Sequence, residues 1–135
     1  MAVTLTLLRI AAPGGSPREI LALVTPSGNY VNGGDTMDLT KLYGQVSQEG
    51  CNIDSDQLPI DAVIESLAGG GAGGGYYLAQ LFTNPGNGQP ATPKALNACL
   101  FRAFQANGTE YTSAAYNASV ISDRIILILK YAPAQ

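Results

Sequence analysis

The sequence contains no histidine and no tryptophan, and only two of its 135 residues are cysteines. Without histidine, neither a Ser-His-Asp triad nor a Cys-His pair can be built, and most zinc sites are excluded. The cysteines, Cys51 and Cys99, form no CxxC motif. We expect Cys99, which stands in an apolar run, to be a small core residue. Whether it pairs with Cys51 stays open.

Charged residues are scarce, at 13% of the chain, which is about half the usual share in globular proteins. So few charges favour a protein that is packed against neighbours. Residues 1–67 carry eight acidic and three basic side chains (net −5), and residues 68–135 carry two acidic and four basic ones (net +2). This split suits head-to-tail contacts between copies, but scattered surface charges explain it more simply. Neither part has the clustered basic face that nucleic-acid binding needs, so no nucleic-acid partner is expected.

Long apolar runs are also missing. No segment approaches the ~20 apolar residues that cross a membrane, so no membrane partner is expected. In the opening segment MAVTLTLLRI, apolar residues alternate with polar ones, and the segment is too short for the apolar core of a signal peptide. We therefore expect a protein that is made in a cytosol-like compartment, or carried on a particle assembled there.

The glycine-rich stretch AGGGAGGGYY at 68–77 invites a nucleotide-binding interpretation. A P-loop needs a lysine directly after its last glycine, but no lysine occurs before Lys94. A dinucleotide site needs a helix after the glycines, whereas YYLAQLFT alternates as a strand does. The run is better explained as a hairpin connector, because glycine reaches positive φ without penalty, with partner contact as a possible addition. No cofactor is expected.

Alternation of apolar and polar residues is the main pattern in the chain, and Gly, Pro and Asn clusters interrupt it. No convincing helix of ten or more residues is found. The sequence therefore predicts a single all-β domain over residues 1–135, a jelly-roll-like β-sandwich of about six to eight short antiparallel strands with little or no helix. The expected strands begin at Val3 and then cover Glu19–Thr25, Leu58–Leu67, Tyr76–Thr83, Ala95–Phe104 and Arg124–Tyr131.

The same alternation predicts which residues share a face. The first strand should bury Val3, Leu5 and Leu7, the third should group Ile60, Ala62 and Ile64, and the fifth should group Leu96, Ala98, Leu100 and Phe104, interrupted by Arg102. The last strand is the most apolar and is expected to be central. Residues 38–42 suit one short helical turn or an irregular loop. Residues 45–57 suit a polar surface excursion with at most a short strand.

Catalytic chemistry is not indicated by the remaining residues. Asp54, Asp56 and Asp61 lie close in sequence, but their spacing is not that of an EF-hand, and a solvated acidic loop is the better interpretation. A hydrolase with paired carboxylates would need two acids on adjacent strands facing one pocket, which these scattered acids do not suggest. No metal site and no enzyme activity are expected.

Several short motifs occur in the order found in one group of small proteins. They are MAVTLTLLRI at the start, NYVNGGD at 29–35, the glycine run ending in GYY at 75–77, and RIILILKY at 124–131. Asp38-Leu39-Thr40 and the alanine-rich SAAYNA at 113–118 match two further positions. In these motifs the chain resembles the capsid decoration, or cement, proteins of tailed bacteriophages. The NPGNGQPATP loop and the acidic segment 45–57 depart from that pattern.

The resemblance implies a β-sandwich subunit, commonly trimeric, on the outer surface of an icosahedral phage head. Its partners would be the major capsid protein and copies of itself, and it would stabilise the head by bridging capsid subunits. It would be made in the host cytoplasm and reside on the virion. Each loop contact can be small in such a protein, because joining the subunits makes later contacts intramolecular.

The loops best suited to these contacts have bare backbone or backbone stiffened by proline. The candidate interface residues are Gly69, Gly70, Gly71, Gly73, Gly74, Gly75, Tyr76, Asn84, Pro85, Asn87, Pro90 and Pro93. The alternative function is a small tail- or fibre-associated module that recognises a host surface or glycan. The seven tyrosines suit interfaces, but half-buried positions at strand edges explain most of them.

Overall fold

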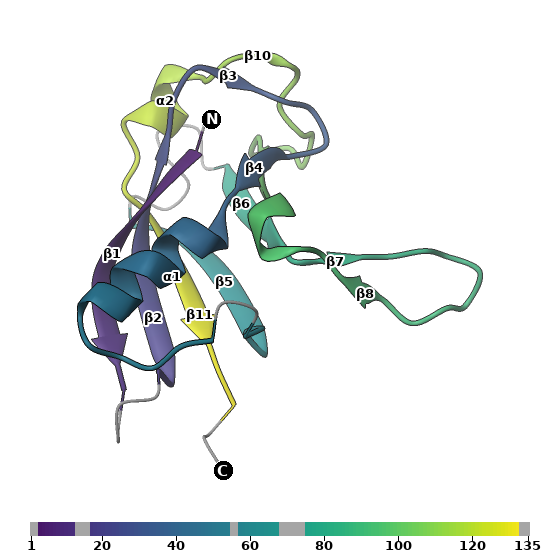
Figure 1. Cartoon of the computed structure of the whole chain (residues 1–135). Helices are drawn as coiled ribbons and strands as arrows, with labels where there is room; N and C mark the ends of the chain where they lie inside the picture. The colour runs from purple at the N-terminus through teal and green to yellow at the C-terminus, as the bar shows by residue number, and fades with distance from the viewer. Residues whose placement is uncertain (1–2, 13–16, 55–56, 68–74, 133–135) are drawn as a thin grey trace.

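Figure 1 shows the chain as a computed structural model in which residues 3–12, 17–54, 57–67 and 75–132 are described. Strands make up 44% of it and helices 15%, and all strand pairs of the described part are antiparallel. The all-β class expected from the sequence is therefore confirmed. The strands are distributed over separate sheets, and the sandwich arrangement stays a prediction.

The largest sheet has four strands, in the order β1 (Val3–Ala11), β2 (Glu19–Pro26), β11 (Ile125–Lys130) and β5 (Asp61–Ser66). Its strands alternate between the core and the outside, as the period-two pattern predicts. Val3 and Leu5 are buried, and Leu7 packs against the core at its edge. The position of β11 between β2 and β5 confirms that the most apolar strand is central.

A second sheet has the order β4 (Asp35–Met37), β9 (Cys99–Phe104) and β6 (Tyr76–Gln80). Here the predicted face of the fifth strand is wrong. A 3-10 helix, η2 (Leu96–Ala98), precedes β9, so the strand begins only at Cys99. Cys99, Phe101 and Ala103 then point into the core, while Leu100, Arg102 and Phe104 are on the outer side. The 3-10 turn interrupts the period-two pattern that the sequence predicts from residue 95 onward.

Two short pairs complete the strands. β3 (Asn29–Tyr30) pairs with β10 (Ala114–Ala115), and β7 (Phe82–Thr83) pairs with β8 (Thr92–Pro93). The expected strand 76–83 is therefore divided in two at Leu81. The expected strand 58–67 begins only at Asp61, which leaves Ile60 outside it and 69% exposed rather than facing inward with Ala62 and Ile64.

The helix α1 (Leu39–Gln48) is longer than the sequence led us to expect, and it corrects the prediction of a polar excursion from residue 45. Asp38 caps it, because its Oδ1 accepts a hydrogen bond from the Thr40 amide at 2.9 Å. Leu39, Leu42, Tyr43 and Val46 are buried, and this spacing puts them on one helical face. A second, short helix is α2 (Ala118–Ile121). Neither described helix is long and apolar enough to cross a membrane.

The helix α1 also closes the outer edge of β1. The Gln45 side chain accepts a hydrogen bond from the Leu7 amide (2.8 Å) and donates one to the Leu5 carbonyl (2.9 Å), as a neighbouring strand would. At these two residues the edge of β1 is therefore shielded from pairing with a strand of another chain. At the other side of the sheet, β5 lies next to β6 without forming a strand pair with it.

One hydrophobic core joins α1 to the inner sides of the two larger sheets. Cys99 is a buried core residue, as expected, and both cysteines are free thiols. The largest fully buried side chains are Tyr30, Phe101, Ile20, Met37, Leu39, Leu42, Ile125, Leu127, Leu129, Val3, Val24 and Val46. We call the two larger sheets, α1 and the core between them the body of the molecule.

Candidate interaction surface

An arm formed by residues 82–93 projects away from the body (Figure 1). Every residue of the arm is exposed, and β7 and β8 join through only two residue pairs. Its tip bends through Gly86, Asn87 and Gly88, which all have positive φ. The Asn84 side chain accepts a hydrogen bond from the Gly86 amide at 3.0 Å, which shapes the start of the turn. The arm therefore has a defined turn, and its side chains remain exposed along the whole of its length.

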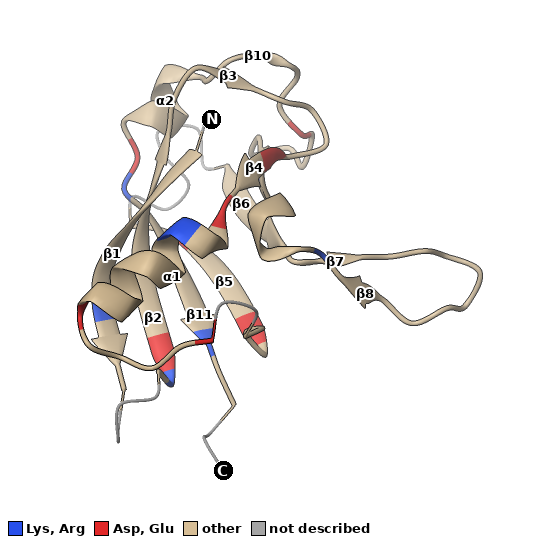
Figure 2. Cartoon of the chain, in the orientation of Figure 1, with Lys and Arg blue, Asp and Glu red and all other residues tan. Residues whose placement is uncertain are grey.

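The root of the arm is fixed to the body. Leu81 is 8% exposed, and its carbonyl accepts a hydrogen bond from the Lys94 amide at 2.8 Å. Leu96, in the turn that follows, is buried in the core. No charged residue lies between Phe82 and Pro93, and the arm is drawn without charge in Figure 2. An anchored, uncharged arm can meet a neighbouring surface without desolvating an ion.

A pocket of about 210 Å³ lies at the root of the arm. Phe82 of the arm is 44% exposed there, and Ile60 is 69% exposed. These apolar side chains belong to one small surface near the seam between β5 and β6. The pocket is lined by Pro59, Ile60, Asp61, Ala62, Ala79, Leu81 and Phe82. Sequence reasoning missed this part of the surface because it assigned Ile60 and Phe82 to strand interiors.

The predicted interface residues form two groups, and the structure describes one of them in full. Asn84, Pro85, Asn87, Pro90 and Pro93 all lie in the exposed arm. Their exposure is confirmed, and their contact with a partner stays a prediction. Gly69, Gly70, Gly71, Gly73 and Gly74 lie outside the described residues, so the hairpin interpretation of this run is not tested.

Gly75 and Tyr76, the last predicted members of the glycine loop, are held by the body. A Cβ added at Gly75 would lie 2.3 Å from the Phe104 carbonyl oxygen, so the backbone approach there requires glycine. The Tyr76 ring is 43% exposed and stacks on the Phe104 ring, with centroids 4.9 Å apart. Gly75 is thus a close-packing residue, and Tyr76 is the one that reaches the surface.

The five buried tyrosines form hydrogen bonds inside the molecule. The Tyr30, Tyr77 and Tyr116 hydroxyls donate to Glu110, Asp123 and Asp35 at 2.6, 2.6 and 2.7 Å. The Tyr131 hydroxyl donates to that of Tyr43, which donates to the Gln57 carbonyl. Burial is the main reason that the pKa of each of these tyrosines is raised, to about 12 for Tyr43. These hydroxyls stay protonated, and their hydrogen bonds link segments of the chain inside the molecule. Most of the tyrosines are therefore buried more deeply than the interpretation as half-buried strand-edge residues assumes.

Glu110 is the centre of the most connected of these clusters. It forms an ion pair with Arg102 at 2.5 Å and accepts hydrogen bonds from the Tyr30 hydroxyl and the Gly33 amide, both at 2.6 Å. Burial opposes its ionisation, but the hydrogen bonds from Tyr30, Arg102 and Gly33 outweigh burial and lower the Glu110 pKa. The carboxylate therefore ties three segments of the chain together.

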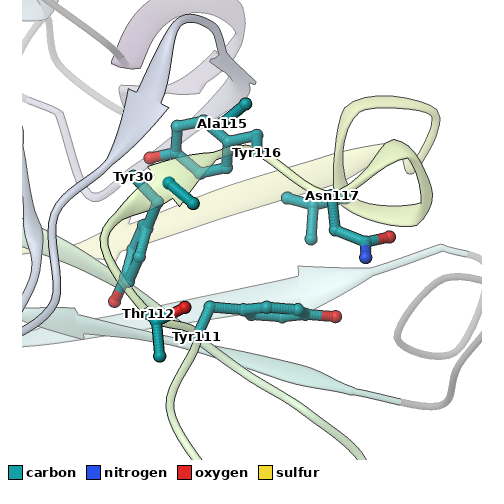
Figure 3. Close-up of a pocket in the computed structure, with 8 residues that line it drawn as sticks. Tyr30, Tyr111, Thr112, Ala115, Tyr116 and Asn117 are labelled. Atoms are coloured by element: carbon teal, nitrogen blue, oxygen red, sulfur yellow. The ribbon is translucent and has the colours of Figure 1, made fainter.

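A second pocket, of about 190 Å³, lies beside this cluster. Figure 3 shows the rings of Tyr30 and Tyr111 along two of its sides, with Asn117 across from Tyr111. The Asn117 Oδ1 accepts hydrogen bonds from the Ser119 amide and hydroxyl, and the Tyr30 hydroxyl is held by Glu110. Tyr111 is the lining aromatic that is only partly buried. The pocket offers an aromatic wall of a size suited to one sugar ring.

No pair of acidic residues lines either of these pockets: Asp61 alone lines the one at the root of the arm, and the lining of the other has no acidic residue. Asp54 is exposed in the loop after α1, and Asp61 is exposed at the start of β5, while Asp56 lies outside the described residues. The described part of the chain contains no group of three or more side chains that could hold a metal ion.

The chain was compared with known protein families, curated proteins and solved structures. No protein-family model matches the chain, no curated protein matches its sequence, and no solved structure matches its fold.

Proposed function

We propose that this chain is a virion structural protein that binds the outside of an icosahedral phage head and stabilises it by bridging major capsid protein subunits. One observation carries the proposal: an uncharged, exposed arm, residues 82–93, projects from a body to which its root is hydrogen-bonded. The order of motifs shared with phage decoration proteins supports the same role. The role is structural and not catalytic.

The physics of the arm favours use in many copies. A single arm contact buries a few hundred Å² at most, below the ~800 Å² per partner of a standard stable interface. Copies that are joined to one another bind the shell with higher avidity, because each later contact is intramolecular. We therefore propose further copies of the chain, as a homotrimer or another small oligomer, as partners beside the capsid protein.

A binding assay with shortened arms tests the proposal. Residues 84–91 are replaced by Asn-Gly, a two-residue turn that can join Thr83 to Thr92, which are paired across β7 and β8. We expect the intact chain to bind phage heads that lack it and to raise their rupture temperature. The shortened variant should fold with unchanged stability and lose most of this binding.

The control carries three exposed substitutions on α1, Lys41→Ala, Ser47→Ala and Gln48→Ala, and should bind as the intact chain does. The proposal is overturned if the intact chain does not bind such heads, or if heads without it withstand heat and low osmotic strength equally well.

The tyrosine-lined pocket in Figure 3 favours a second candidate, a tail- or fibre-associated module that recognises a host surface or glycan. Stacking of a sugar ring on Tyr111 would supply the contact. This candidate expects the isolated domain to bind host cells or their polysaccharide, and Tyr111→Ala to abolish the binding. An isolated domain that binds neither excludes it.

A further inference from the structure

The outer face of the four-stranded sheet is apolar at its centre. Leu21 and Leu23 of β2 point outward, opposite Ile128 and Ile126 of β11. Leu21, Leu23 and Ile128 are partly exposed, whereas Ile126 is 7% exposed. The helix α1 packs on the core side of the sheet and at the β1 edge, and so leaves these residues to the outer face. On the flanking strands, Leu8 is 44% exposed and Val63 is 40% exposed. An apolar face that crosses four strands marks an interaction surface.

The charges around this centre lie at opposite sides of the sheet. A bulge in β1 leaves both Leu8 and Arg9 beside Leu21, and Arg9 is exposed. On β5, at the far side, exposed Glu65 pairs with Ile126. At one end of the sheet, Lys130 of β11 stands opposite Glu19 of β2, and charges of both signs gather there in Figure 2.

These charges have no ion-pair partner in the described part of the chain, where Arg102–Glu110 is the only ion pair. Arg9 and Glu65 are too far apart to pair within one copy, because β2 and β11 lie between their strands. The face therefore carries an apolar centre and unpaired charges of opposite sign on its two sides.

We propose that a second copy of this chain covers this face, about a two-fold axis that runs along the strands between β2 and β11. Such an axis places β2 over the partner's β11 and β1 over the partner's β5. Leu21 then faces the partner's Ile128, and Leu23 faces the partner's Ile126. The apolar centre of each copy is covered by the same residues of the other, as a self-complementary interface requires.

The charges become complementary about the same axis. Glu19 faces the partner's Lys130, and the symmetry repeats this contact. Arg9 faces the partner's Val63, with the partner's Glu65 two residues along the strand, about 7 Å away and within reach of an arginine side chain. An axis across the strands would instead bring Arg9 near the partner's Arg9 and Glu65 near the partner's Glu65. Charge therefore selects the axis along the strands.

The contact is small enough for its edge charges to decide whether it forms. Four strands of six residues span about 19 by 20 Å, or about 380 Å² per copy, which is below the ~800 Å² per partner of a standard stable interface. This inference does not rest on the capsid role. A two-fold contact by itself builds a dimer, whereas the resemblance to decoration proteins implies a trimer, so a mass measurement separates the two.

Charge reversal in trans tests the dimer, with mass measured by sedimentation equilibrium at protein concentrations up to about 1 mM. We expect the intact chain to dimerise. Arg9→Glu alone and Glu65→Arg alone should each weaken the dimer about tenfold or more, because each brings like charges together twice. An equimolar mixture of the two variants should dimerise again, because every contact in the mixed dimer pairs opposite charges. A stability effect within one chain would not be rescued by mixing.

The control, Lys41→Glu on α1, changes the net charge as Arg9→Glu does but lies off the face, and should leave the dimer intact. Thermal unfolding of each variant shows that it is folded. A monomeric intact chain overturns the proposal, and so does an oligomer whose mass is insensitive to both reversals or is not restored by mixing.

Discussion

At the scale of the residue, the glycine-rich run has one member whose role the structure settles. Gly75 stands so close to the Phe104 carbonyl that a methyl group would lie 2.3 Å from its oxygen. Gly75→Ala should therefore lower the free energy of unfolding by about 1–3 kcal/mol, because the backbone of β9 must move. Urea denaturation measures this change in the free energy of unfolding. Gly44→Ala, inside α1 with no atom near the added methyl group, should stabilise by about 0.5–1 kcal/mol. Equal effects of the two substitutions would contradict the close approach.

The Glu110 cluster predicts a pH dependence at the same scale. The pKa of this carboxyl is lowered from its usual 4.5, so its stabilising contribution is complete above that pH and is lost as the pH falls through the lowered pKa. Glu110→Gln should lower the free energy of unfolding at pH 7 by about 1–3 kcal/mol, because it leaves Arg102 unpaired. The difference from the intact chain should shrink in acid. Glu49→Gln, at an exposed carboxylate, should change little, and a difference that grows in acid would refute the assignment.

At the scale of the element, α1 protects the edge of β1 through one side chain. Gln45→Ala removes both hydrogen bonds to the Leu5 and Leu7 backbone and should cost about 1–3 kcal/mol of unfolding free energy. It should also speed hydrogen exchange at the Leu7 amide. Gln48→Ala, exposed on the same helix, is the matched control. Unchanged exchange at Leu7 in the Gln45 variant would show that the edge is protected in another way.

The elements also show what the sequence could and could not predict. Strands were found where alternation is uninterrupted, as in β2 and β11. The helix α1 was underestimated, although the Asp38 cap and the spacing of Leu39, Leu42 and Val46 signal it, because Gly44 and the polar residues after it weaken the pattern. The inward face of β9 was misassigned because a 3-10 turn is not visible in period-two alternation.

At the scale of the whole molecule, the arm was predicted as a loop from its prolines and glycines, and its exposure is confirmed. The rest of the candidate surface depends on strands far apart in sequence. Arg9 and Glu65 belong to one face only because β2 and β11 separate β1 from β5, and strand order is not readable from alternation. The set of residues that surround a sheet face is therefore decided by the tertiary fold. No local sequence pattern marks Arg9 or Glu65 as part of such a set.

The central claim is that this body and its arm serve to attach many copies to a phage head. The most direct measurement is immunogold or cryo-electron tomographic localisation of the protein on particles of the phage that encodes it. The account predicts regularly spaced density over the outer surface of the head lattice. Density confined to the tail or its fibres, or no density on the particle, would contradict it.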